Sequence, residues 1–294
     1  TSYNREKYIA EAIESVLRSS YTNYELIICD DRSTDRTVEI ARSYAARDPR
    51  IKVYVNEKNL GDYPNRNRVA SYARGKYLKY QDSDDIIYPH TLQIMVDHME
   101  NFPEVSVAFC GNEIQDYSQP YPVCFSPQEA YRTHFFDRNS LFYQGPVATI
   151  IRRETFERYG PFSGVRYVGD AEMWMIFARY TPVLKIQPGL IWWRTHPGQE
   201  FSMGTEDYVL LKYQLNKQVL EHPDCPLTEV ERNAALGNNR RLLGRKILRL
   251  VFGRLAISSA IKLYRDAGLK PAILLESVIP VNRLKRLNGK LARP

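Results

Sequence analysis

Residues 76–85 read KYLKYQDSDD, and residues 25–31 read ELIICDD. Each stretch is a short run with apolar residues that ends in a cluster of aspartates. Such a run, bounded by polar residues, is typical of a buried strand, and segments with helical spacing of apolar residues flank both runs. Strands that alternate with helices through short links predict a mostly parallel sheet covered by helices. The first hundred residues therefore predict an α/β fold in which two strands end in acidic residues.

The position of these aspartates points to a ligand site, because ligands of such sheets bind at the carboxyl ends of the strands. Asp82, Asp84 and Asp85 are close enough to repel one another. Hydrogen-bond donors or a divalent cation such as Mg²⁺ or Mn²⁺ would be needed to keep all three charged. A solvated acidic loop that caps the next helix explains the cluster equally well. Capping of a helix likewise explains Asp30-Asp31 as well as ligand binding does.

Composition narrows the class of protein. The chain has 294 residues, of which 44% are hydrophobic and 26% charged, and these values argue against disordered, collagen-like and coiled-coil proteins. No apolar run approaches the roughly 18 residues of a transmembrane helix. The four cysteines are widely spaced, which favours a reducing compartment over a disulfide framework or a zinc site.

The net charge of +7 is unevenly distributed. Residues 232–294 hold 15 Lys and Arg against 2 acidic residues, or +13, whereas residues 1–231 hold 26 against 32, or −6. Because the excess of basic over acidic residues is confined to this tail and no nucleic-acid-binding motif is present, no nucleic-acid partner is expected. Between residues 240 and 255, Arg and Lys alternate with Leu, Ile and Val. This pattern predicts either a helix on an anionic membrane surface or a helix packed on the rest of the chain.

A series of motifs carries more information than any one of them. The series begins with Thr1-Ser2-Tyr3-Asn4, which precedes an amphipathic helix. Four motifs then follow in order: residues 24–35 (YELIICDDRSTD), Asn59-Leu60-Gly61, residues 75–78 and Asp82-Ser83-Asp84-Asp85. In order and spacing the series resembles the family 2 glycosyltransferases, which are inverting enzymes of GT-A fold that use nucleotide-activated sugars. The resemblance covers roughly residues 1–200. It implies a GT-A type, Rossmann-like sheet flanked by helices.

The resemblance implies a nucleotide pocket at the start of the chain. Thr1 and Tyr3 match its first residues, and the tyrosine ring is expected to pack on the base. Asp31 matches the carboxylate that reads the base, with Asp30 beside it.

The second acidic cluster matches the D-x-D motif of the family. Asp82 and Ser83 are expected on the nucleotide-sugar side. Asp84 and Asp85 are expected to hold Mn²⁺ or Mg²⁺ at the diphosphate, and family members differ in which aspartate touches the metal.

Two later motifs complete the implied site. Gly169-Asp170-Ala171-Glu172 resembles the motif that supplies the catalytic base, so Asp170 is the expected base and Glu172 the second candidate. Without the resemblance, capping of the apolar helix that follows is the simpler role for Asp170. Arg194-Thr195-His196-Pro197 resembles the R-x-H loop that closes over the donor phosphates, so Arg194 and His196 are expected there.

The resemblance also implies an organisation for the chain. Residues 1–204 are expected to form the GT-A catalytic domain, and residues 205–294 a helical extension that is basic from about residue 232. Family members have a short apolar strand before the equivalent of Thr1. No such strand precedes Thr1 here, so we expect this sequence to lack the first strand of the domain.

Together these features predict a metal-dependent, inverting glycosyltransferase. The expected donor is a nucleotide diphosphate sugar, and a UDP-sugar is the first candidate. The expected acceptor is a glycan or lipid-linked hydroxyl in bacterial-type surface polysaccharide or glycolipid assembly. The expected location is the cytoplasm, with peripheral attachment to the inner face of the plasma membrane. The alternatives are a nucleic-acid-binding protein, an inactive scaffold and a sugar-nucleotide pyrophosphorylase. Pyrophosphorylases carry a Gly-rich, basic phosphate loop near the N-terminus, and this sequence has no such loop.

Overall fold

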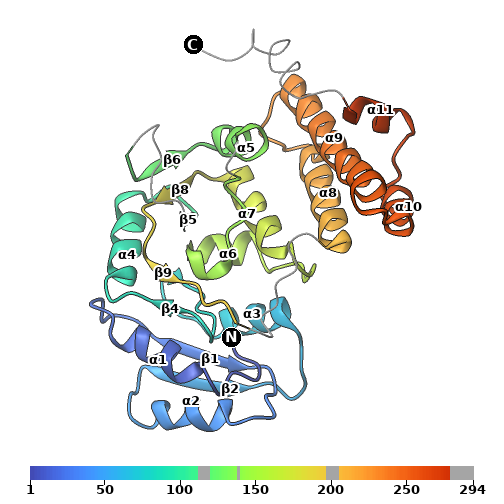
Figure 1. Ribbon diagram of the computed structural model, residues 1–294. Coiled ribbons are helices and arrows are strands. Elements are labelled where there is room, and N and C mark those ends of the chain that lie inside the picture. Colours follow the sequence, from blue (N-terminus) through green and yellow to red (C-terminus); the bar gives the residue numbers. More distant parts are fainter. Residues whose placement is uncertain (112–119, 138–139, 197–204, 279–294) are drawn as a thin grey trace. The chain divides into compact units, whose positions relative to one another are not determined.

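The structure is a computed structural model that describes residues 1–111, 120–137, 140–196 and 205–278. The chain divides into two compact units, Thr1–Glu200 and Phe201–Pro294. The first unit contains strands and helices, and the described part of the second contains helices (Figure 1).

The first acidic strand belongs to a small parallel sheet. Strand β1 (Leu26–Asp30) pairs with β2 (Ile51–Val55), with Leu26 opposite Ile51. Helices α1 (Ile9–Leu17) and α2 (Thr37–Ala45) bury their apolar residues against it because these residues recur at helical spacing. The shared core consists of Ile9, Ile13, Ile28, Ala41 and Ile51.

A second, five-stranded sheet has the order β3-β7-β5-β8-β6. Its strands are β3 (Tyr77–Leu78), β5 (Val107–Cys110), β6 (Val123–Phe125), β7 (Thr149–Arg152) and β8 (Val183–Ile186). Its helices and one 3₁₀ turn are α4 (Thr91–Asn101), α5 (Pro127–Phe136), η1 (Pro146–Ala148), α6 (Arg153–Tyr159) and α7 (Gly169–Tyr180). Strand β5, at the centre of this sheet, is fully buried, which explains its continuous apolar sequence.

Two further elements position the acidic residues. Helix α3 (Asp62–Ser71) precedes β3. Strand β4 (Ile86–Ile87), which follows the second acidic cluster, pairs antiparallel with β9 (Ile191–Trp192). This pairing places the Arg194–His196 loop beside the aspartates, although about a hundred residues separate them in the chain.

The α/β class and the flanking helices agree with the prediction from sequence, but the strand directions need a correction. Among the strand pairs of the described residues, β1–β2 and β5–β8 are parallel, and the other four are antiparallel. Beyond residue 111 the chain returns along both edges of β5 and β8, so that β7 and β6 run against their neighbours. The sheet is therefore mixed, not mostly parallel. Helix α5 and strand β6 form regular structure between residues 123 and 136.

The described part of the second unit is helical, as expected from about residue 205 onward. Its helices are α8 (Glu206–Glu221), α9 (Glu229–Arg254), α10 (Ile257–Asp266) and α11 (Ala272–Val278). A capping box of Thr228 and Glu231 starts α9. Between residues 240 and 255, Leu243, Ile247 and Leu250 pack inside this unit and are buried with residues of α8 and α10. Within the described ranges, no helix is both long and apolar enough to cross a bilayer.

Candidate active site

Asp82 is held by a buried arginine of α3. Arg66 Nη2 lies 2.7 Å from Asp82 Oδ1, and Arg66 Nε lies 2.8 Å from Asp62 Oδ1, one turn earlier on the helix. Burial acts to raise the pKa of Asp82, but the charge and hydrogen bond of Arg66, together with other nearby cations such as Lys79, outweigh burial and lower that pKa. Arg66 is only 7% exposed, and its Nη1 has no hydrogen-bond partner within the described part of the chain. This nitrogen is therefore a donor that a bound oxygen atom could satisfy.

Asp84 is contacted by Arg5 and His196, which come from opposite ends of the first unit. Its Oδ2 accepts a hydrogen bond from Arg5 Nε at 2.9 Å and lies 3.0 Å from His196 Nε2. The His196 ring also packs on the Tyr8 ring, with 4.5 Å between centroids. The carboxylate of Asp84 thereby joins the start of the chain to the loop after β9.

Asp85 is linked to Arg194. The backbone N–H of Arg194 donates to Asp85 Oδ1 at 2.9 Å, and Arg194 Nε donates to the carbonyl of Asp84 at 2.8 Å. The guanidinium also pairs with Glu11. Burial and the neighbouring carboxylates raise the pKa of Asp85 to about 7. The crowding expected from the sequence therefore raises the pKa of Asp85, whereas at Asp82 Arg66 and other nearby cations together lower the pKa.

The carboxylates at the end of β1 bind groups of the protein itself. Asp30 accepts a hydrogen bond from the backbone N–H of Ser33 at 2.7 Å. Asp31 fixes the turn before α3, in which Gly61 adopts a φ of 86° that suits glycine. Its donors are the N–H groups of Leu60 at 2.7 Å and Gly61 at 2.8 Å, and Asn56 Nδ2 at 2.8 Å.

Helix α7 places Asp170 in its first turn. Tyr63 Oη accepts the backbone N–H of Asp170 at 3.1 Å, and Asp170 Oδ1 accepts the N–H of Ala171 at 2.7 Å. Burial raises the pKa of this half-buried carboxyl to about 6, although the N–H of Ala171 and the charge of Arg66 act in the opposite direction. A Cβ atom on Gly169 would lie 2.8 Å from the Tyr63 ring, so glycine permits this close approach.

Helix α3 connects the two groups of carboxyls. Tyr63 contacts Asp170, and one turn later Arg66 pairs with Asp82. Arg66 is also among the charges that act on Asp170, so the two carboxyls share one electrostatic environment. Glu172, the second candidate base, accepts a hydrogen bond from Ser163.

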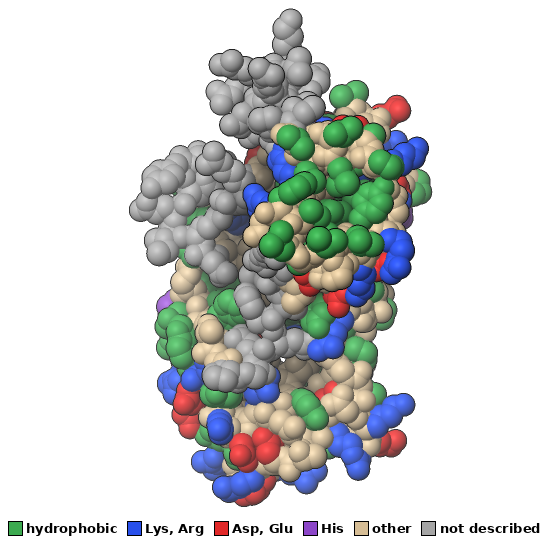
Figure 2. All heavy atoms as spheres, turned by 45° about the vertical axis from the view of Figure 1, so that its right-hand side comes forward, with side chains coloured by type: hydrophobic (Ala, Val, Ile, Leu, Met, Phe, Trp, Pro, Cys, Tyr) green, Lys and Arg blue, Asp and Glu red, His purple; other side chains and the backbone are tan. Residues whose placement is uncertain are grey.

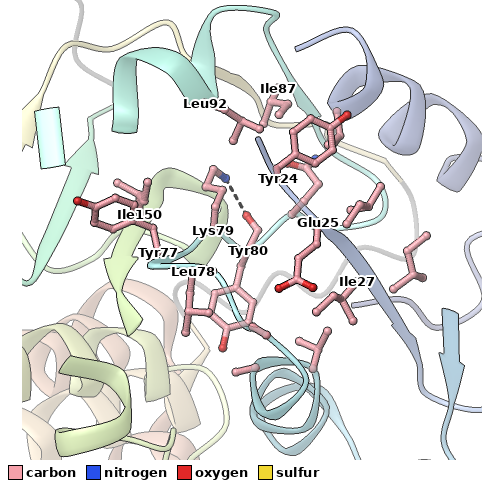
Figure 3. A pocket seen from close by; sticks show the side chains of 18 of the residues that line it. Tyr24, Glu25, Ile27, Tyr77, Leu78, Lys79, Tyr80, Ile87, Leu92 and Ile150 are labelled. Atoms are coloured by element: carbon pink, nitrogen blue, oxygen red, sulfur yellow. Dashed lines mark hydrogen bonds between the residues drawn. The ribbon is translucent and has the colours of Figure 1, made fainter. Parts of the chain in front are cut away.

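A cavity of about 790 Å³ lies between β1 and β3 (Figure 3). Apolar side chains of α1, β1, α3 and α4 form much of its wall, and Thr1 and Ser83 line it as well. Lys79 Nζ donates to the carbonyls of Tyr80 at 2.7 Å and Val147 at 2.5 Å, and burial lowers the pKa of this lysine to about 8. The cavity is a gap between two strands with mainly hydrophobic walls, which differs from the polar surroundings that a diphosphate needs.

Comparison with known proteins identifies the family. The model of the glycosyl transferase family 2 matches residues 1–160, more than half of the chain. The chain belongs to glycosyl transferase family 2. It is similar to the putative glycosyltransferase EpsE of Bacillus subtilis, with 42% identity over 115 residues, 39% of this chain and 41% of EpsE. It is also similar to the UDP-Glc:alpha-D-GlcNAc-diphosphoundecaprenol beta-1,3-glucosyltransferase WfgD of Escherichia coli, with 39% identity over 98 residues, 33% of this chain and 38% of WfgD.

The chain therefore spans about two fifths of the length of these curated relatives. Among solved structures, the mannosyltransferase PcManGT of Pyrobaculum calidifontis, in complex with GDP-Man and Mn²⁺, has a TM-score of 0.58 at 18% sequence identity. That similarity covers 98% of this chain and 86% of PcManGT, and it supports the GT-A type fold.

In this family 2 member, the structure brings together some of the residues that the resemblance selected. Asp84 and Asp85 lie against Arg194 and His196. Ser2, next to Thr1 and Tyr3, pairs in parallel with Asp30 at the end of β1.

Three residues of this cluster were not found from the sequence: Arg5, Tyr63 and Arg66. The spacing of Asp62 and Arg66 is that of a helical ion pair and is visible in the sequence. Only the fold shows that this arginine is buried and shared with Asp82.

The donor atoms of the second cluster suit a divalent metal. Asp84 and Asp85 supply the oxygen ligands that Mg²⁺ and Mn²⁺ prefer. No group of three or more His, Cys, Asp or Glu in the described residues is arranged to hold a metal ion. Mg²⁺ is usually bound by one or two carboxylates together with substrate phosphates, so two adjacent carboxylates are sufficient.

Proposed function

We propose that this family 2 glycosyltransferase transfers a sugar from a nucleotide diphosphate sugar to an acceptor hydroxyl, with inversion at the anomeric carbon. A UDP-sugar is the first candidate for the donor. One observation carries the proposal: α3 contacts Asp170 through Tyr63 and Asp82 through Arg66. A general base must be ionised and must lie near the donor. With a pKa of about 6, Asp170 is mostly ionised at neutral pH and more basic than an ordinary aspartate.

On the donor side, we assign the base to Thr1, Tyr3 and the end of β1. The Tyr3 side chain is 46% exposed, which leaves its ring accessible for stacking. Asp31 accepts three hydrogen bonds within the protein, which leaves one acceptor position of the carboxylate for a base N–H. Asp30 orders the residues around it. Asp82 and Ser83 then fall on the sugar side of the nucleotide.

The chemical step uses the groups of this chain as follows. Asp170 accepts the proton of the acceptor hydroxyl, whose oxygen attacks the anomeric carbon from the face opposite the diphosphate. The bond from that carbon to the diphosphate oxygen breaks, and the nucleotide diphosphate leaves with its electron pair. We assign the pairing with the leaving phosphates to Arg194, His196 and Arg5, which contact Asp84 in the structure. Mn²⁺ or Mg²⁺ held by Asp84 and Asp85 would supply further positive charge at the diphosphate.

We assign the acceptor to the glycan or lipid-linked class used in bacterial surface polysaccharide or glycolipid assembly. The names of relatives support this assignment, because that of WfgD includes a diphosphoundecaprenol-linked sugar. Such an acceptor is anchored in a membrane. We therefore place the enzyme in the cytoplasm, attached peripherally to the inner face of the plasma membrane.

A thermal-shift series tests the donor and metal assignments. UDP at about 100 times its dissociation constant should stabilise the first unit by about 2.7 kcal/mol, and more strongly with Mn²⁺ than without it. Asp84→Ala should remove the effect of Mn²⁺, whereas Asp97→Ala, at an exposed position of α4, should preserve it. An unchanged response to Mn²⁺ in Asp84→Ala would show that the metal assignment is wrong. A product that retains the anomeric configuration, read by NMR, would refute the inverting mechanism.

A further inference from the structure

The helical unit carries a group of exposed hydrophobic side chains that its own core does not use. Phe252 and Leu255, at the end of α9, are both 80% exposed, and Ile261 on α10 is 60% exposed. On α11, Leu275 is 77% exposed and Val278 is 70% exposed. Figure 2 shows hydrophobic side chains gathered on one face of this unit. We call these five residues, together with Ile257, the apolar face.

The three helices of the apolar face are packed together. Leu250 of α9 and Leu263 of α10 share a core with Tyr213 of α8. Helix α11 crosses α9 closely at Gly244, where an added Cβ would lie 2.1 Å from Ser277 Oγ. The apolar face therefore belongs to a folded surface and does not result from a loose helix. An exposed group of large hydrophobic side chains on such a surface marks an interaction site.

Basic residues lie close in sequence to those of the apolar face. Arg249 precedes Phe252 by one turn of α9, and Lys262 and Arg265 follow Ile261 on α10. All three are exposed, and Lys270 is exposed in the segment before α11. Residues 240–278 hold 9 Lys and Arg against 2 acidic residues, a net charge of +7. Hydrophobic side chains next to basic residues match the chemistry of an anionic lipid bilayer. Its acyl region accepts the hydrophobic side chains, and its headgroups attract the basic ones.

We infer that the apolar face inserts into the interface of an anionic membrane and is the surface by which this enzyme docks. This inference deepens the peripheral location given in the proposed function. It differs from the sequence-based expectation, because Leu243, Ile247 and Leu250 of the basic helix are buried in the core. The docking residues lie instead where α9 ends and on α10 and α11.

Vesicle sedimentation of the full chain tests the inference. The protein should pellet with vesicles that contain phosphatidylglycerol, less with pure phosphatidylcholine, and less as salt is raised. Phe252→Ser combined with Ile261→Ser should weaken binding by about tenfold or more. The matched control is Val230→Ser, which removes a hydrophobic side chain that is 62% exposed near the start of the same helix. Its distance from residue 252 along the helix is about 33 Å, so it should leave binding unchanged.

Several outcomes would overturn the inference. Equal vesicle binding by the double variant and the parent would assign binding to another part of the chain. Absence of vesicle binding, with self-association that is lost in the double variant, would make the apolar face a protein interface. Melting temperatures should agree among all variants, because the replaced side chains are exposed. UDP binding and transfer to a soluble acceptor should be unchanged in the double variant, so failure of docking and failure of the proposed function give different results.

Discussion

Replacement of Asp170 by asparagine should make the protein more stable and less active. The folded environment raises the pKa of Asp170 from 3.8 to about 6, so the ionised carboxylate at neutral pH opposes folding. A shift of this size corresponds to about 3 kcal/mol. Loss of the favourable position at the α7 N-terminus offsets about 0.3–1 kcal/mol of this gain. Asparagine can still accept the N–H of Ala171, so we expect a net gain of about 1–3 kcal/mol.

The pH dependence of this gain follows from the direction of the shift. Below pH 3.8 the carboxyl is protonated in both the folded and the unfolded chain, so the variant has no advantage. Between pH 3.8 and about 6 the unfolded chain ionises first, and the parent loses stability relative to the variant. Above about 6 the difference is constant. Urea denaturation at about pH 3 and at pH 7.5 measures both limits.

The transfer rate should change in the opposite direction. Removal of a positioned base costs about 10²–10⁴-fold, while UDP affinity should be preserved because the base serves the acceptor. Glu172→Gln is the matched control, since it removes a charge from the same turn of α7. Near-normal turnover in Asp170→Asn with loss in Glu172→Gln would transfer the role of base to Glu172. A stability loss in Asp170→Ala with normal turnover would show that this aspartate only caps the helix.

Three further substitutions test the structure around the site. Gly169→Ala should lower the free energy of unfolding by about 1–3 kcal/mol and lower the transfer rate, because the added methyl group displaces Tyr63. Gly253→Ala is the control: its Cβ would meet no atom within 4 Å, so thermal melts should show a neutral or stabilising effect. Arg66→Met should destabilise by about 3–5 kcal/mol at pH 7 because Asp82 loses its cation, with partial recovery at acidic pH; equal losses at both pH values would contradict this. Ser126→Ala should cost about 1 kcal/mol in chemical denaturation because it removes the capping box of α5, and no loss would mean that packing alone fixes this helix.

The sequence alone was sufficient for the local elements of the first hundred residues. Their patterns are regular: β1 lies in the apolar run of residues 25–31, and α1 is the amphipathic helix that follows Asn4. The order of the motifs was also sufficient to identify the family that the comparisons establish. Helix α5 could have been predicted too, since Ser126 and Glu129 have capping-box spacing and Pro127 occupies the first helical position.

Tertiary structure decided the strand directions and the partners of each carboxylate. The sequence shows that Asp82, Asp84 and Asp85 must repel one another, but the cations that compensate them come from Arg5, Arg66 and the loop after β9. A pKa depends on burial and on charges within a few ångströms, and neither follows from distance along the chain. Distance along the chain also does not distinguish the buried leucines of α9 from the exposed Phe252, because both occur in one basic, apolar stretch. The packing of α8, α10 and α11 against α9 determines which of these side chains remain at the surface.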